Sequence, residues 1–193
     1  MAFTAQDVKA LREKTGVGMM ECKKALVEAD GDMDKAVDFL RERGLAAAQK
    51  KATRIAAEGV VLPYYDAQAK KGVVVEVNSE TDFVAKNEKF MNFVEGVAKT
   101  ILATNPADVE ALKEEKFDGT DRTVTETLND LVLSIGENMK VRRFERMDGV
   151  VSTYIHGGGS VGVMVGFDVA DESKASAPEF DAMGKNVAMQ IAA

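Results

Sequence analysis

Apolar residues recur at two different spacings along this chain, and the spacing changes near residue 58. In the first part they repeat every three or four positions, as Val37 and Leu40 do, which places them on one face of a helix. Further along, Val73 and Val75 belong to a run in which valines occupy every second position, which is typical of a strand. The pattern predicts an α+β protein in which helices come first and strands follow.

Residues 1–44 are predicted to form three short helices. Thr4 followed by Asp7 is a capping-box pattern that opens the first helix. Asp32 is suited to cap the third helix, and Gly44 is placed where a helix would end in a left-handed residue. The apolar faces are short, so the helices need one another and are expected to form a compact bundle.

Two further stretches favour helix. Residues 45–57 are rich in alanine and are expected to form a helical linker or a lid on the next domain. A helical insertion is predicted around residues 105–136, with Pro106 at the first helical position, Thr123 opening a second helix and Gly136 ending it. A strand with exposed arginines is expected to follow the insertion.

The chain also repeats itself at an offset of 90 residues. Glu58-Gly59-Val60-Val61 returns as Asp148-Gly149-Val150-Val151. Each copy has two alternating segments followed by a helical one, so we predict two related units, 58–147 and 148–193, each a β-hairpin with a helix across one face. The same offset relates these further pairs: Tyr64 and Tyr154, Gly72 and Gly162, Val73 and Val163, Val75 and Val165, Phe90 and Phe180, Ile101 and Ile191.

Composition excludes several classes of function. The net charge is −7, which argues against a protein that binds nucleic acid through its phosphates. Cys22 and His156 are the only cysteine and histidine, so a Cys/His metal site within the chain is impossible, and no cofactor is expected. His156 begins a glycine run but no nucleophile motif accompanies it, so no enzymatic active site is predicted. No apolar run is long enough to span a membrane, so a cytoplasmic protein is expected.

The turn after the second alternating segment carries the main candidate site. Thr81-Asp82-Phe83-Val84 places an aromatic residue on a polar connection. One interpretation puts Phe83 in the core; the other makes it an aromatic plug presented to a partner by a rigid scaffold. The second unit has Ser173 at the equivalent position, which favours the second interpretation because the core residues survive the duplication.

A second candidate is the methionine pair that follows the glycines of the first turn. Met19 and Met20 cannot both face the core of a short helix. Either one of them is buried and the other exposed, or both form an adaptable apolar patch for a partner, with Lys23 beside them.

Two stretches carry a resemblance to a known family. EVNSETDFVAKN and LREKTGVGMMECKKAL resemble the two signatures of the elongation factor Ts family, in the same order and spacing. The resemblance implies an N-terminal bundle like the ubiquitin-associated fold and nucleotide exchange on elongation factor Tu, in its GDP-bound and nucleotide-free forms, by disturbance of its Mg²⁺ site. The exchange residues would be Thr81, Asp82, Phe83 and Val84, and the partner-binding residues Met19, Met20, Lys23, Ile135, Gly136 and His156.

The chain ends within a helical pattern, and members of the family are commonly longer. The second unit is therefore expected to be short or incomplete, and a homodimer could complete it. The alternative function is a binding module in which the N-terminal bundle recognises a ubiquitin-like or nascent-chain partner; this would need residues 1–44 alone.

Overall fold

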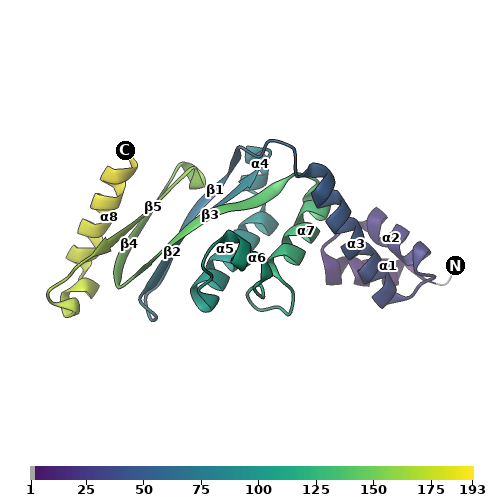
Figure 1. Ribbon diagram of the computed structural model, residues 1–193, viewed down its shortest axis with the longest axis horizontal. Helices are drawn as coiled ribbons and strands as arrows, with labels where there is room; N and C mark the ends of the chain where they lie inside the picture. The colour runs from purple at the N-terminus through teal and green to yellow at the C-terminus, as the bar shows by residue number, and fades with distance from the viewer. Residues whose placement is uncertain (1–2) are drawn as a thin grey trace. The chain divides into compact units, whose positions relative to one another are not determined.

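The computed structural model describes residues 3–193 (Figure 1), so the first two residues of the predicted bundle lie outside the described part. The chain divides into two compact units. We call the residues up to Ile55 together with Thr125–Met139 the helical unit, and Ala56–Val124 together with Lys140–Ala193 the α+β unit. Helices come first and antiparallel strand pairs follow, so the predicted α+β class is confirmed.

The helical unit is closed by its own apolar core. Thr4 and Asp7 form the predicted capping box, and the Asp32 side chain accepts hydrogen bonds from two backbone amides at the start of the third helix. Leu26 and the single cysteine, Cys22, are fully buried in the core that these helices share. The helices are α1 (Ala5–Thr15), α2 (Met19–Glu28), α3 (Met33–Lys51) and α7 (Val124–Ile135).

The expectation that the third helix ends at Gly44 is wrong. Helix α3 runs through Gly44 to Lys51, so the first half of the expected linker is its last turns. Gly44 is buried, and a Cβ there would lie 3.2 Å from the backbone oxygen of Asn129 on α7. This glycine therefore allows close packing of two helices and does not end one of them.

The α+β unit contains two sheets, each with an antiparallel hairpin, and the helices that cover them. Three strands form the first sheet in the order β1 (Glu58–Asp66), β2 (Lys71–Ser79), β3 (Met139–Asp148), and two form the second, β4 (Val150–His156) and β5 (Val161–Phe167). The helices are α4 (Asp82–Ala85), α5 (Glu88–Thr104), α6 (Val109–Glu114) and α8 (Pro178–Ala192), with 3₁₀ turns η1 (Gly157–Gly159) and η2 (Glu172–Ser176).

The 90-residue repeat is confirmed in the strand register. Val60 pairs with Val77 in the first hairpin, and the residues 90 positions later, Val150 and Phe167, pair in the second. Helix α5 packs against β1 and β2, and α8 packs against β4 and β5 (Figure 1). Each copy of the repeat is therefore a β-hairpin with a helix across one face, as the sequence predicts.

The two hairpins meet at equivalent glycines. A Cβ on Gly72 would lie 2.7 Å from the Met164 sulfur, and a Cβ on Gly162 would lie 2.7 Å from the Val61 carbonyl oxygen. Gly162 is the residue 90 positions after Gly72, so each repeat supplies the same position for close approach to the other. A side chain at Gly162 would press against the Val61 backbone, whereas a side chain at Gly72 would have to displace the flexible Met164 side chain.

The two helices of the repeat differ in how well they are covered. Val97 of α5 is fully buried, whereas its equivalent Val187 on α8 is 37% exposed. On α5, the Phe117 ring stacks on Phe93 with centroids 5.5 Å apart and fills the space above Gly96. The segment that follows α5 thus covers that helix, while α8 exposes apolar side chains.

The expected helix start at Pro106 is also wrong, because α6 begins at Val109. Asn105 adopts a left-handed conformation and ends α5, so it does not cap the next helix. That role passes to Asp108, whose Oδ1 accepts a hydrogen bond from the Ala111 amide at 2.8 Å. Helix α7 ends at Ile135 as expected, before Gly136 at φ +91°.

Candidate functional site

The predicted exchange segment, residues 81–84, leads into a short helix at the end of a strand. Strand β2 ends at Ser79, and α4 begins three residues later at Asp82. Ser79 is fully buried, and its hydroxyl donates a hydrogen bond to the Thr81 carbonyl oxygen at 2.9 Å. At the surface, the Lys86 ammonium lies 3.2 Å from the Asp82 carboxylate. The turn therefore has a polar contact at the buried Ser79 and another at the surface.

Phe83 and Val84 are neighbours with opposite environments. The Phe83 side chain is 79% exposed, whereas Val84 is buried, and α4 packs against β1, β2 and α5. The interpretation that Phe83 belongs to the core is thus wrong for the free chain. Since Val84 anchors α4, the phenyl ring is held in solvent by a structured element and not by a loose loop.

The equivalent turn in the second copy of the repeat is built differently. It forms η2, in which the Asp171 carboxylate accepts hydrogen bonds from the Ser173 amide at 3.1 Å and from the Ser173 hydroxyl at 2.6 Å. Ser173 and Lys174, which replace Phe83 and Val84, are both exposed. The second unit therefore has neither the exposed aromatic residue nor the buried anchor.

Met19, Met20 and Lys23 lie together at the start of α2. Met19 is 43% exposed and Met20 is 67% exposed, so the interpretation in which one of the pair is buried is wrong. All three line an apolar pocket of about 310 Å³. The sequence did not identify the rest of its lining, which comes from the start of α1: Phe3, Thr4, Ala5 and Val8.

The remaining predicted partner-binding residues are divided between the two units. Ile135 is half-buried at the end of α7 and Gly136 is exposed after it, both in the helical unit. His156 is exposed at the end of β4 in the α+β unit, and its Nδ1 lies 3.2 Å from the Tyr154 hydroxyl. Met19, Met20 and Lys23 thus share a unit with Ile135 and Gly136, and His156 shares one with Phe83.

His156 has no arrangement for nucleophilic chemistry in the described structure. The three glycines after it form the turn of the β4–β5 hairpin, as predicted. The Ser160 hydroxyl donates to the His156 backbone carbonyl at 3.3 Å and not to the imidazole ring. Within residues 3–193, no group of three histidine, cysteine or acidic side chains is placed to hold a metal ion, and no helix is long and apolar enough to cross a membrane.

A charged cluster on β2 and β3 was not predicted from the sequence. The Glu76 carboxylate on β2 accepts hydrogen bonds from Arg143 at 2.7 Å, Asn78 at 3.1 Å and Arg142 at 3.4 Å. Burial alone would raise the pKa of Glu76, but the hydrogen bonds from Arg143 and Asn78 and the two arginine charges outweigh it and lower that pKa. In the sequence, the arginine pair Arg142-Arg143 is visible on a predicted strand, but the carboxylate that it binds lies 66 residues before Arg142.

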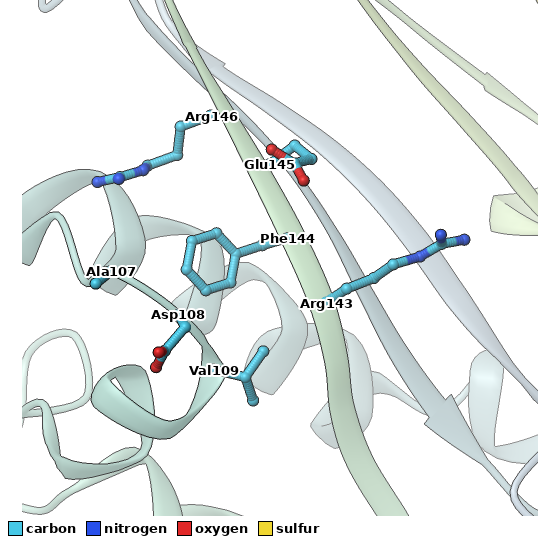
Figure 2. Close-up of a pocket in the computed structure, with 7 residues that line it drawn as sticks. All are labelled: Ala107, Asp108, Val109, Arg143, Phe144, Glu145 and Arg146. Atoms are coloured by element: carbon cyan, nitrogen blue, oxygen red, sulfur yellow. The ribbon is translucent and has the colours of Figure 1, made fainter.

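Another pocket, of about 360 Å³, lies between the start of α6 and β3. Figure 2 shows the Phe144 ring and the Arg146 side chain on the side of Ala107, while Arg143 and Glu145 point to the opposite side of the strand. Nη1 of Arg146 is buried without a hydrogen-bond partner. None of the predicted site residues lines this pocket, so it is separate from the exchange segment.

Comparison with known proteins identifies the family. The family described as elongation factor TS matches residues 80–193, which is more than half of the chain. The chain belongs to the elongation factor Ts family. An elongation factor Ts from Clostridium perfringens is 56% identical over 99% of this chain, and one from Syntrophotalea carbinolica is 52% identical over all of it.

The chain is shorter than these elongation factor Ts relatives. It spans 62% of the Clostridium perfringens protein and 63% of the Syntrophotalea carbinolica protein. The family match begins at Glu80, directly before the exposed Phe83 turn, and continues through the second repeat. The similarity to the relatives covers both the helical unit and the α+β unit, including the pocket formed by α1 and α2.

Proposed function

We propose that this chain accelerates the release of GDP from elongation factor Tu, and thus its exchange for GTP, during translation elongation. Membership of the elongation factor Ts family supports this proposal. The observation that carries it is the exposure of Phe83 on α4, where the next residue, Val84, is buried in the core. An exchange factor makes and breaks no covalent bond, so the chain would not be an enzyme in the usual sense.

The proposed mechanism is mechanical disturbance of a metal site in the partner. Asp82 and Phe83, flanked by Thr81 and Val84, would enter the nucleotide domain of elongation factor Tu beside its Mg²⁺. This ion requires near-ideal octahedral geometry at short distances. A rigid side chain that displaces its ligands therefore weakens GDP binding without contacting GDP.

The exchange factor and the nucleotide weaken each other's binding to elongation factor Tu, and this makes the complex reversible. If this chain weakens nucleotide binding by some factor, nucleotide must weaken the binding of this chain by the same factor. The nucleotide-free form of elongation factor Tu is thus the form that we expect to bind most tightly. Rebinding of GTP would then release the exchange factor.

Two other surfaces are proposed to hold the partner while the exchange segment acts. The pocket with Met19, Met20 and Lys23 offers flexible thioethers beside one positive charge, which suits an apolar surface next to a carboxylate. Ile135, Gly136 and His156 are proposed as weaker contacts. No direct contact with nucleic acid is proposed, since the net charge is −7.

The deciding experiment is to time the release of a fluorescent GDP analogue from purified elongation factor Tu. We expect the rate to rise with the concentration of the chain and then to saturate. Excess EDTA provides the reference, because it removes Mg²⁺ without any protein contact. A release rate that does not change at any concentration of folded chain would refute the proposal.

A second candidate function is favoured by the pocket in the helical unit. It lies outside the α+β unit that carries Phe83, so it could bind an apolar segment of another protein by itself. In that case Met20→Ala would weaken binding to such a partner and Phe83→Ala would not. Loss of nucleotide release in Phe83→Ala would instead favour the exchange function.

A further inference from the structure

Ser79 connects the end of β2 to the turn that carries Phe83. It is the last residue of the β1–β2 ladder, where it pairs with Glu58, and it has no exposed surface. Its hydroxyl reaches across the turn to the Thr81 carbonyl oxygen at 2.9 Å. We infer that Ser79 is a positioning residue for nucleotide exchange, which fixes α4 so that Phe83 is presented in one orientation. This inference rests on the proposed function.

Helix α4 needs such support because it is too short to be stable by itself. It has four residues, and an isolated helix in water needs about 12 or more. Its hydrogen bonds include Lys86 N to Phe83 O at 3.2 Å and Asn87 N to Val84 O at 2.9 Å. The ion pair of Asp82 with Lys86 is exposed, and such pairs contribute little.

Buried contacts therefore set the orientation of α4. The Val84 side chain fixes its inner face, and the Ser79 hydroxyl fixes the backbone immediately before it. The Ser79 hydroxyl is buried and its hydrogen bond to Thr81 is partly buried, so this bond constrains the backbone more strongly than the exposed ion pair does. Phe83 follows the bonded carbonyl by two residues, so a shift of that peptide moves the ring.

The second repeat provides a comparison within the same chain. Strand β5 ends at Phe167, two residues before the position equivalent to Ser79, and Val169 stands at that position. The equivalent of Val84 is the exposed Lys174, and the equivalent of Phe83 is Ser173. The second copy of the repeat, which has no equivalent of Phe83, thus lacks equivalents of Ser79 and Val84 as well, although its hairpin has the same register.

This difference separates a functional role from a general structural one. The hairpin and its helix form in the second unit without a hydroxyl at position 169. The Ser79 hydrogen bond is therefore not required by the repeat fold itself. It accompanies the exposed phenylalanine, and its expected role is to control where that ring points.

The test is a double-mutant cycle on GDP release from elongation factor Tu, with the fluorescent GDP analogue as the probe. Ser79→Ala should lower the maximal release rate about fivefold, the factor that corresponds to one hydrogen bond of about 1 kcal/mol. The concentration for half-maximal effect should change much less, because the other contact surfaces remain. Added to Phe83→Ala, Ser79→Ala should have no further effect, since it acts through that ring.

Ser173→Ala is the matched control, because it removes a hydroxyl from the equivalent turn of the second unit. It should leave the release rate unchanged. A Ser79→Ala protein with the release rate of the unsubstituted chain would overturn the inference. So would a double variant in which the two effects multiply, since Ser79 would then act independently of Phe83.

A measurement without the partner distinguishes failure of this inference from failure of the proposed function. In the chain alone, Ser79→Ala should accelerate hydrogen exchange at the Lys86 and Asn87 amides and leave the Val97 amide unchanged. Unaltered exchange at Lys86 and Asn87 would refute the positioning role even if the unsubstituted chain releases GDP. If Ser79→Ala does not fold, Ser79→Cys retains a weaker donor and should give an intermediate effect in both measurements.

Discussion

Phe83 is a large apolar side chain that the free protein leaves in water. Burying such a side chain in a complex is worth about 1.5–3 kcal/mol. Because Val84 and Ser79 already hold the turn, little ordering remains to be done when a partner binds. An exposed aromatic residue on a fixed element is thus suited to a contact that transmits force.

We predict that Phe83→Ala abolishes most nucleotide release and leaves the protein folded. A buried phenylalanine changed to alanine costs about 3–5 kcal/mol of stability, whereas a side chain that is 79% exposed should cost far less. Thermal melting of the variant and its effect on GDP release separate the two cases. A melting temperature lowered as for a core variant, with release intact, would contradict the mechanism.

Asp82→Ala is the matched companion to that variant. Its ion pair with Lys86 is exposed and should contribute less than about 1 kcal/mol. The variant should therefore slow GDP release without lowering the melting temperature appreciably.

His156→Ala is predicted to have a modest effect on exchange. The residue is exposed, its polar contact is with Tyr154, and no proton transfer is assigned to it. Loss of one such hydrogen bond is worth about 0.5–1.5 kcal/mol, which corresponds to roughly a 2- to 12-fold change in rate. Complete loss of release in a folded His156→Ala protein would show that the residue has a central role.

At the scale of secondary-structure elements, the duplication explains which features were predictable. A repeat compares the chain with itself, so the strands and helix of one copy could be matched with those of the other, as Tyr64 and Tyr154 or Gly72 and Gly162 illustrate. Local capping was also predictable, as Thr4 and Asp32 illustrate. These features depend on residues close together in the chain or on an exact sequence offset.

The error at Gly44 and the failure to predict the Glu76 cluster have a common physical cause, which is a contact with a distant segment. Gly44 resembles a helix end locally, but the approach of α7 to α3 determines its use. The Glu76 cluster was missed because its arginines come from β3, more than 60 residues away. In the candidate site, Phe83 could be proposed from the repeat, but Phe3 and Val8 could not, because their pocket forms only when α1 meets α2.

The Glu76 cluster predicts a specific pH dependence of stability. A carboxylate whose pKa is lowered by folding contributes stability above its ordinary pKa of about 4.3, and this contribution is lost as the pH falls through the lowered pKa. Glu76→Gln should therefore be less stable than the unsubstituted chain at pH 7. The difference should shrink below about pH 4.3.

Chemical denaturation of both proteins between pH 7 and pH 3 would measure this effect. The Glu76 side chain is only 12% exposed, so its loss should be detectable despite the exposure of Arg143. Glu145→Gln, on the neighbouring strand and exposed, is the control and should show no such difference. A stability difference that is the same at every pH would contradict the assignment.

The three N-terminal helices are predicted to fold by themselves. Their core includes Leu11, Leu26 and Leu40, and the starts of the first and third helices are capped by side chains within the segment. Because α3 extends to Lys51, residues 1–55 are the better fragment to express, with residues 1–44 as the comparison. Circular dichroism should show helix and a cooperative melt, and a fragment without either would refute independent folding.

At the scale of the whole molecule, the α+β unit exposes apolar surface on its last helix. Ile191 is 60% exposed and Val187 is 37% exposed, although their equivalents on α5, Ile101 and Val97, are fully buried. An exposed apolar helix face favours association with another surface. We therefore predict that the chain forms homodimers.

Sedimentation over a range of concentrations would measure this association. Ile191→Lys should weaken it by placing a charge on the exposed face of α8, whereas Val27→Lys on α2 provides a control at another exposed apolar residue. Sedimentation as a monomer at high micromolar concentration would exclude the dimer.

Burial of Cys22 has a practical consequence for labelling. Burial raises the pKa of this thiol, and its sulfur lies 3.5 Å from the Val17 carbonyl oxygen inside the helical core. It is the only cysteine in the chain, so a maleimide reagent would find no accessible native sulfhydryl while the fold is intact. A cysteine introduced on the surface could therefore receive a single fluorophore without removal of the native one, and slow modification of Cys22 would report transient opening of the helical unit.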